Sequence, residues 1–154
     1  MERTIEIIKT FFKNNNWKYS YDEEDKVFKL GVNMGNILGN VQLYIFLEES
    51  SYNVLTILNS KCEEKDYPVV AEFLHRANYG LKDGNFEIDY EDGEIRYKSF
   101  VNFKNVELSQ EIVEQSITIG VTMINRYGKG LLKLMLGEES AKRCVEYCED
   151  IKNE

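Results

Sequence analysis

Hydrophobic residues near the start of the chain recur every three or four positions, which is the period of an amphipathic helix. Ile5, Ile8 and Phe12 carry this pattern, and the polar run 14–16 ends it. Further along, hydrophobic and polar residues alternate one by one in several short segments, as they do in half-buried strands. These predicted strands lie at 28–32, 41–47, 52–58, 86–90 and 95–98, and a further short strand is predicted near Trp17.

Two neighbouring strands carry hydrophobic side chains on both of their faces. In segment 41–47 the odd positions are aliphatic, whereas the even positions include Tyr44 and Phe46. Segment 52–58 is apolar on both faces, which predicts a central strand that is covered on both sides. The aromatic face of segment 41–47 therefore needs a cover. The pattern leaves open whether helices of this chain, a second subunit or a peptide supplies it.

The strongest local signal is the pair Asp92-Gly93, which separates two of the predicted strands. A two-residue Asp-Gly loop favours a type I′ hairpin turn. This turn predicts that Asp89 lies opposite Arg96 and that Glu87 lies opposite Lys98. Opposite charges would then pair on one face of the hairpin and apolar side chains on the other, which supports this register.

Polar capping residues predict where the later helices begin. Asp66 is a candidate cap for a helix with Pro68 in its first turn, and Ser109 is a candidate cap for a longer helix. Gly128 and Gly130 are expected to interrupt this long helix, with a short helical piece and a last amphipathic helix after them. A narrow polar stripe runs along the long helix at Glu111, Gln115, Thr118, Thr122 and Asn125.

The predicted elements follow the order α-β-β-β-α-β-β-α, with further C-terminal helices. This order favours an α+β protein with a single twisted, mainly antiparallel sheet and helices packed on it. The chain has 154 residues and no repeat, low-complexity tract or linker, so we expect one domain over residues 1–154.

Charge and cysteine usage narrow the classes of function. The chain has 27 acidic and 19 basic residues, which gives a formal net charge of −8 and argues against a nucleic-acid partner. No apolar run reaches the length of a membrane span, so no membrane partner is expected. Three cysteines in no framework spacing and the absence of a signal-peptide pattern predict a cytoplasmic protein.

Three short segments resemble the YbjN-like family, whose members are described as bacterial sensory-transduction regulators. Phe73–Asn78, Gly84–Asp89 and Asp92–Tyr97 read FLHRAN, GNFEID and DGEIRY. The order of the elements also resembles the type III secretion chaperone fold that this family shares. The resemblance implies an α+β fold with one twisted sheet, dimerisation and no assigned catalytic residues.

The residues best suited to chemistry do not form a recognisable catalytic, cofactor or metal site. His75 is the only histidine, and no nucleophile is suggested near it in the sequence. Cys144 and Cys148 are four residues apart on a predicted helix, but the other ligands of a metal site are missing. Cys62 lies in a charged stretch, and the acidic run 22–25 lacks the ligand spacing of a calcium loop. We therefore expect no catalytic residues, no cofactor and no metal.

These observations favour a non-enzymatic binding or regulatory protein, chaperone-like, that holds a polypeptide partner. The candidate partner-binding residues are Tyr44, Phe46 and Tyr52. A homodimer is also expected, because the polar stripe of the long helix is too narrow for a helix on the surface of a monomer. Two alternatives stay open: a small-molecule sensor domain, which would need an enclosed apolar cavity, or an enzyme of unrecognised type built from scattered carboxylates.

Overall fold

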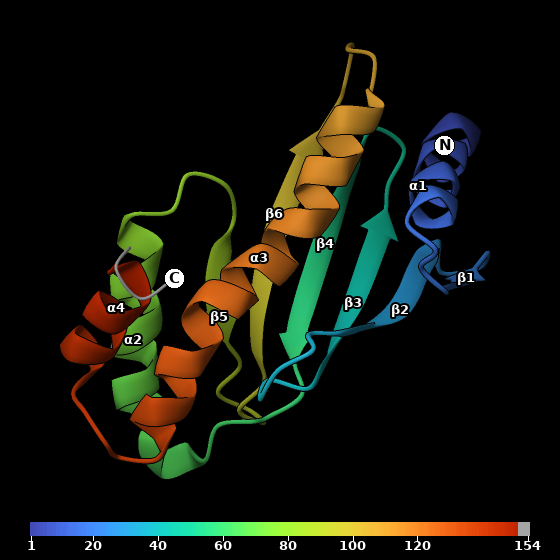
Figure 1. Ribbon diagram of the computed structural model, residues 1–154. Coiled ribbons are helices and arrows are strands. Elements are labelled where there is room, and N and C mark those ends of the chain that lie inside the picture. Colours follow the sequence, from blue (N-terminus) through green and yellow to red (C-terminus); the bar gives the residue numbers. More distant parts are fainter. Residues whose placement is uncertain (151–154) are drawn as a thin grey trace.

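A computed structural model describes residues 1–150 as one antiparallel sheet packed against four α-helices (Figure 1). The six strands follow the spatial order β1-β2-β3-β4-β6-β5, and every neighbouring pair is antiparallel. This confirms the predicted α+β class and element order. The helices are α1 (Glu2–Asn14), α2 (Tyr67–Tyr79), α3 (Gln110–Met135) and α4 (Ala141–Glu149), with a short 3-10 helix η1 (Glu64–Asp66). The strands are β1 (Ser20–Asp22), β2 (Val27–Asn33), β3 (Asn40–Leu47), β4 (Ser51–Leu58), β5 (Asn85–Ile88) and β6 (Ile95–Asn102).

The helices pack on one face of the sheet, where the side chains of alternate strand residues are buried. In β3, Val41, Leu43 and Ile45 are fully buried, whereas the residues between them are partly or well exposed. Figure 1 shows α3 lying along β4 and β6, with α1 towards β2 and the pair α2 and α4 towards β5. The core has two clusters, one beneath α1 and the N-terminal half of α3 and one among α2, α4 and the C-terminal half of α3.

The opposite face of the sheet is not covered by any helix of the described residues, and we call it the open face. The sequence pattern predicted a cover on both sides of segment 52–58, and the helices of the described residues supply it on one side only. In β4 the residues on the helix side are buried, but Asn53, Leu55 and Ile57 are only partly buried. Alternation of apolar side chains shows which residues share a face, but it cannot show that a cover exists.

The β5–β6 hairpin has a different register from the predicted one. Glu87, not Asp89, lies opposite Arg96. The connection is longer than two residues, since the N–H of Asp89 donates to the carbonyl of Glu94 and the N–H of Gly93 donates back to the carbonyl of Asp89. Gly93 has a φ of 77°, and a Cβ there would lie 2.0 Å from the carbonyl oxygen of Cys62. The turn is thus shaped by its packing against Cys62, which the local Asp-Gly signal does not reveal.

Helix α3 runs without interruption through Gly128 and Gly130, contrary to the prediction from these glycines. Both glycines are sites of close packing rather than breaks. A Cβ at Gly128 would lie 2.8 Å from the Leu38 side chain, and a Cβ at Gly130 would lie 2.3 Å from the Cys148 sulfur. The missing side chains let α4 and the 34–39 loop approach the helix, and this offsets the low helix propensity of glycine.

The helix starts agree with the predicted caps, with one difference in detail. Ser109 is the N-cap of α3, and its Oγ accepts a hydrogen bond from the N–H of Ile112 at 3.3 Å. Asp66 precedes α2, and Pro68 lies in the first turn, but the side chain of Asp66 makes no capping hydrogen bond. None of the helices within residues 1–150 is long and apolar enough to cross a membrane.

Candidate binding surface on the open face of the sheet

Strand register brings the side chains of the open face into rows that cross the sheet. One row runs from Lys29 through Tyr44 and Leu55 to Lys98. The next row places Phe46 opposite Asn53, which lies opposite Phe100. A third row ends in Ile57, Arg96 and Glu87. The apolar members of this surface are Tyr44, Phe46, Leu55, Ile57 and Phe100, and its cations are Lys29, Arg96 and Lys98.

The aromatic side chains of the open face are accessible to solvent. Phe46 is 40% exposed and Phe100 is 57% exposed. The rings of Tyr44 and Phe46 stack at a centroid distance of 6.2 Å and an angle of 21°. Large apolar side chains gathered on one surface are typical of a contact site rather than of ordinary solvent-facing sheet. Tyr44 and Phe46 are thus placed together as the sequence interpretation required.

Tyr52 does not belong to this surface. Its side chain lies on the helix side of β4, fully buried, and its hydroxyl pairs with Ser116 Oγ of α3 at 2.8 Å. Burial raises the pKa of Tyr52 to about 12, and the hydrogen bond with Ser116 opposes that rise only in part. The structure therefore separates Tyr52 from the other two candidate residues by the thickness of the sheet, and Tyr52 acts in the core.

The charges on the open face differ from those of the chain as a whole. Lys29, Arg96 and Lys98 lie on this face with Glu87, Glu94 and Asp22, so its charges balance in a chain whose formal net charge is −8. Arg96 Nε donates to Glu87 Oε2 at 2.9 Å, and Lys98 Nζ also pairs with Glu87. Burial acts to raise the pKa of Glu87, but hydrogen bonds from Lys98, Arg96 and Asn85 hold it below its usual value. The carboxylate thus stays ionised, and the three cations of this face are matched by the carboxylates of Glu87, Glu94 and Asp22.

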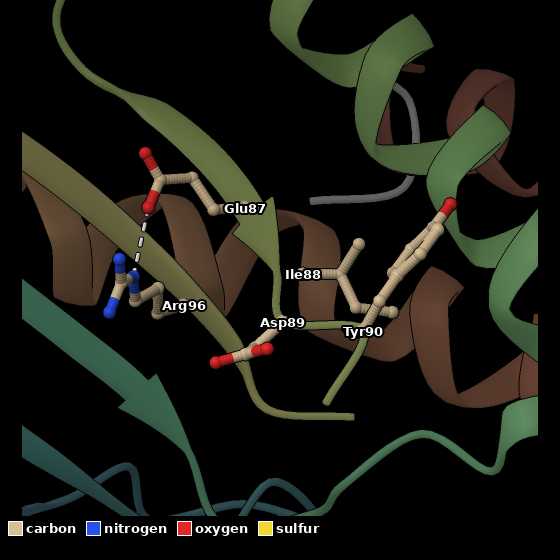
Figure 2. Close-up of a pocket in the computed structure, with 5 residues that line it drawn as sticks. All are labelled: Glu87, Ile88, Asp89, Tyr90 and Arg96. Carbon is tan, nitrogen blue, oxygen red and sulfur yellow. Dashed lines mark hydrogen bonds and ion pairs between the residues drawn. The ribbon is translucent and has the colours of Figure 1, made fainter. Parts of the chain in front are cut away.

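A hollow of about 580 Å³ lies at the margin of this surface, beside the edge strand β5 (Figure 2). Figure 2 shows Glu87 and Arg96 facing one another across β5 and β6, while Ile88 and Tyr90 point to the opposite side. None of its lining residues is a histidine, cysteine, serine or lysine, and the carboxylate of Glu87 is bound to Arg96. The other carboxylate of the lining, that of Asp89, accepts a hydrogen bond from the N–H of Glu91 at 2.8 Å, so both carboxylates have partners within the chain.

The other chemically suited residues are not brought together. His75 is exposed on α2, whereas Cys62 is buried, and burial raises the pKa of its thiol. Cys144 is also buried, and the Cys148 thiol donates to the carbonyl of Tyr127 at 3.6 Å. Burial is the main cause that raises the pKa of Cys148 to about 11, so this thiol is a poor nucleophile at neutral pH. Within residues 1–150 no group of three or more potential metal ligands converges.

The fold and its surface define an α+β protein with helices on one side of its sheet and aromatic and charged side chains on the other. A family model described as "YbjN: Putative bacterial sensory transduction regulator" matches residues 4–133, and the chain belongs to the YbjN family. This confirms the family that the three sequence segments indicated.

Two individual proteins are also similar to the chain. The crystal structure of YbjN from E. coli, described as "a putative transcription regulator", is matched over 79% of this chain and 89% of that chain, with a TM-score of 0.57 and 11% sequence identity. At this identity the match shows the fold alone. A glycine–tRNA ligase of Mycoplasma capricolum subsp. capricolum is 26% identical over 116 residues, which cover 74% of this chain. The matched region is 24% of the ligase, so the chain spans about a quarter of that relative's length.

Several residues of the surface were not singled out in the sequence. Lys29, Leu55 and Lys98 join Tyr44 in one row only because four strands pair in the observed register. Phe100 lies beyond the predicted end of its strand. Alternation within each segment gave the facing of these side chains, but which strands are neighbours depends on long-range pairing.

Proposed function

We propose that this chain is a non-enzymatic regulatory protein that holds an extended polypeptide segment against the open face of its sheet. The observation that carries the proposal is the one-sided packing of the helices, which leaves Phe46 and Phe100 exposed and Tyr44 partly exposed on the other side. The family description as a regulator is consistent with binding rather than catalysis.

The charges favour an occupant that combines apolar and acidic side chains. Lys29 has no carboxylate opposite it in the register, whereas Lys98 pairs with Glu87 and Arg96 pairs with both Glu87 and Glu94. Acidic groups of a segment would meet Lys29 and compete with Glu87 for Lys98, and such charge complementarity steers encounter and fixes orientation. Apolar groups of the same segment would cover the aromatic rings.

A single-stranded nucleic acid is the rival occupant, because exposed aromatic rings beside cations also suit bases and phosphates. The ligase relative has tRNA in its name, which is a second reason to consider a nucleic-acid occupant. The net charge of −8 opposes it, since an acidic protein repels a phosphate backbone and the open face offers only three cations. The experiment must therefore be able to detect RNA binding as well as peptide binding.

A random-sequence peptide display library, panned against the full chain, tests the proposal. The variant Phe46→Ser removes an exposed ring from the open face, and Tyr79→Ser removes a ring that is 95% exposed on α2. We expect selected peptides that bind the parent chain and Tyr79→Ser equally and bind Phe46→Ser at least about tenfold more weakly. Peptides that bind all three proteins alike, or tighter binding of single-stranded polyuridine than of any selected peptide, would overturn the proposal.

The homodimer stays a prediction, and the structure alters its basis. Much of the apolar arc of α3 is buried inside the chain against α1, α2, α4 and the sheet. Among the residues that stay outside, Ile112 is 42% exposed. Light scattering at micromolar concentration checks the prediction, and a mass near the 18.0 kDa of one chain would contradict it.

A further inference from the structure

Strand β6 extends beyond its neighbour β5 and leaves a length of unpaired strand edge. Strand β5 begins at Asn85, which lies opposite Lys98. On its other side β6 stays paired with β4 as far as Asn102, which lies opposite Ser51. Residues 99–102 therefore have a strand neighbour on the β4 side only, and we call their other side the free edge.

The backbone groups on the free edge belong to Phe100 and Asn102. Alternate residues of an antiparallel strand direct both the N–H and the C=O to the same side. The N–H of Phe103 donates to Ser50, which connects with β4, and the C=O of Glu94 accepts from Asp89 next to β5. Odd residues of β6 thus bond towards β4, and even residues bond towards β5 or its empty extension.

The outer edge of β5 differs from the free edge, because a side chain of α2 bonds its backbone groups. The side-chain amide of Asn78, on α2, donates to the C=O of Phe86 at 3.0 Å and accepts from its N–H at 2.7 Å. This amide occupies the backbone groups of β5 as a further strand would. The free edge of β6 has no such side chain among the hydrogen bonds of the described residues.

A hollow of about 180 Å³ lies directly beside the free edge, between β6 and α3. Its apolar wall includes Val101 of β6 with Ile112 and Ile119 of α3. Asp83 and Gly84 lie at the end near β5, where Gln115 Nε2 donates to Asp83 Oδ2 at 3.1 Å. A cavity of about 150 Å³ accepts a benzene ring, so this hollow has room for one large apolar side chain. Side chains of an added strand would alternate between this hollow and the open face beside Phe100.

Strand β2 also extends past its short neighbour β1, but the surroundings there differ. The backbone groups that face outward belong to Gly31 and Asn33, which are exposed. The side chain of Asn33 accepts a hydrogen bond from the N–H of Gly35, just as that of Asn102 accepts one from the N–H of Lys104, so this contact is common to both edges. The apolar hollow lies at the β6 edge, which distinguishes it from the β2 edge.

We propose that residues 99–102 of β6 receive an added strand, supplied by a polypeptide segment in which apolar side chains alternate with acidic ones. Its apolar side chains enter the hollow under α3, and its acidic side chains lie on the open face, towards Lys98. The inference rests on the proposed function. It adds the strand edge that receives the segment, the backbone hydrogen bonds that hold it and the alternation of its apolar and acidic side chains. A second copy of the chain is less complementary, because paired edges would place the same Lys98 on both sides.

Two substitutions at Asn102 test the edge with the fold held constant. Asn102→Pro removes an N–H that faces the free edge and leaves the bonds to β4 in place, whereas Asn102→Ala removes the same side chain and keeps the N–H. The probe is a short fluorescent peptide in which Glu alternates with Leu, and an analogue with Lys in place of Glu is the charge control. Thermal midpoints of the two variants confirm that both fold.

We expect Asn102→Ala to bind the Glu–Leu peptide as the parent does and Asn102→Pro to bind it about tenfold more weakly, with little binding of the Lys–Leu analogue. Equal binding by the two variants would overturn strand addition. If Phe46→Ser then weakens binding and Asn102→Pro does not, the open face is the site and the proposed function survives alone. No binding of the Glu–Leu peptide by the parent chain would overturn the acidic occupant, and a dimer that Asn102→Pro dissociates would assign the edge to a second copy.

Discussion

The two faces of the sheet carry hydrophobic side chains in the same alternating pattern, but they meet different surroundings. On the helix side of β3, Leu43 and Ile45 are fully buried under α1 and α3. On the open face of the same strand, Phe46 is 40% exposed and stacks on Tyr44. The helix side is mainly aliphatic, whereas the open face mixes aromatic rings with cations. One face thus forms the core, and the exposed rings of the other are the basis for the proposed contact with a partner.

Adjacent residues of β3 give the largest expected contrast. Ile45→Ala should lower the free energy of unfolding by about 2–5 kcal/mol, because it leaves a cavity in a fully buried cluster. Phe46→Ala should cost about 1 kcal/mol or less, because the ring already contacts solvent. Denaturant titration of both variants measures the two values. Equal losses would show that the open face is covered in solution and would break the comparison.

The packing of α3 onto the helix side of β4 can be tested with two glycines. Gly120→Ala should lower the free energy of unfolding by about 1–3 kcal/mol, since the new Cβ would lie 2.2 Å from Thr56 Oγ1. Gly80→Ala is the control: a Cβ there meets nothing within 4 Å, so the change should be neutral or stabilising by about 0.4–1 kcal/mol. A Gly120→Ala variant as stable as the parent would mean that α3 does not lie this close to β4.

Alkaline pH should lower the free energy of unfolding, because Tyr52 is buried on the helix side of the sheet. Its pKa is about 12 in the folded chain because of burial, whereas an unfolded tyrosine titrates near pH 10. A raised folded pKa contributes stability that is fully present below about pH 10 and is lost as the pH rises towards 12. The expected slope is about 1.4 kcal/mol per pH unit for this residue.

Denaturation of the parent chain and Tyr52→Phe at several alkaline pH values measures this slope. The variant loses the hydroxyl pair with Ser116 and should start less stable, but its stability should fall less steeply above pH 10. Parallel curves for the two proteins would contradict the buried placement of Tyr52.

The smallest effect concerns the hydroxyl of Thr56, which is fully buried and has no hydrogen-bond partner within the described residues. Thr56→Val replaces that hydroxyl with a methyl group of similar size. We expect the free energy of unfolding to rise by about 1 kcal/mol, because the cost of burying an unsatisfied polar group disappears. A loss of stability in the thermal or denaturant midpoint would show that the hydroxyl has a partner in solution.

Local sequence patterns predicted most helices and strands and which side chains of a strand share a face. They did not predict what packs against each face. The period of Ile5, Ile8 and Phe12 predicted α1, and the alternation through Tyr44 and Phe46 predicted which side chains share a face. The hairpin register failed because packing of Gly93 against Cys62 replaced a two-residue turn with a longer one. Likewise, the glycines of α3 mark close contacts that only the tertiary structure defines.

The candidate site was predicted in part for the same reason. Tyr44 and Phe46 were found from their own strand, but Tyr52 was assigned to the surface although it lies in the core. Its strand is apolar on both faces, so the sequence does not say which face the helices cover. The free edge of β6 depends on the difference in length between two paired strands, which alternation does not reveal.

Methyl NMR of the full chain, titrated with a display-selected peptide, tests the central claim most directly. Leu55 and Ile57 of β4 report on the open face, and Leu43 and Ile45 of the neighbouring strand β3 report on the helix side. We predict that the methyl signals of Leu55 and Ile57 shift with peptide concentration while those of Leu43 and Ile45 stay nearly unchanged. Shifts confined to Leu43 and Ile45, or to the methyl groups of α2 and α4, would contradict the open face as the binding surface.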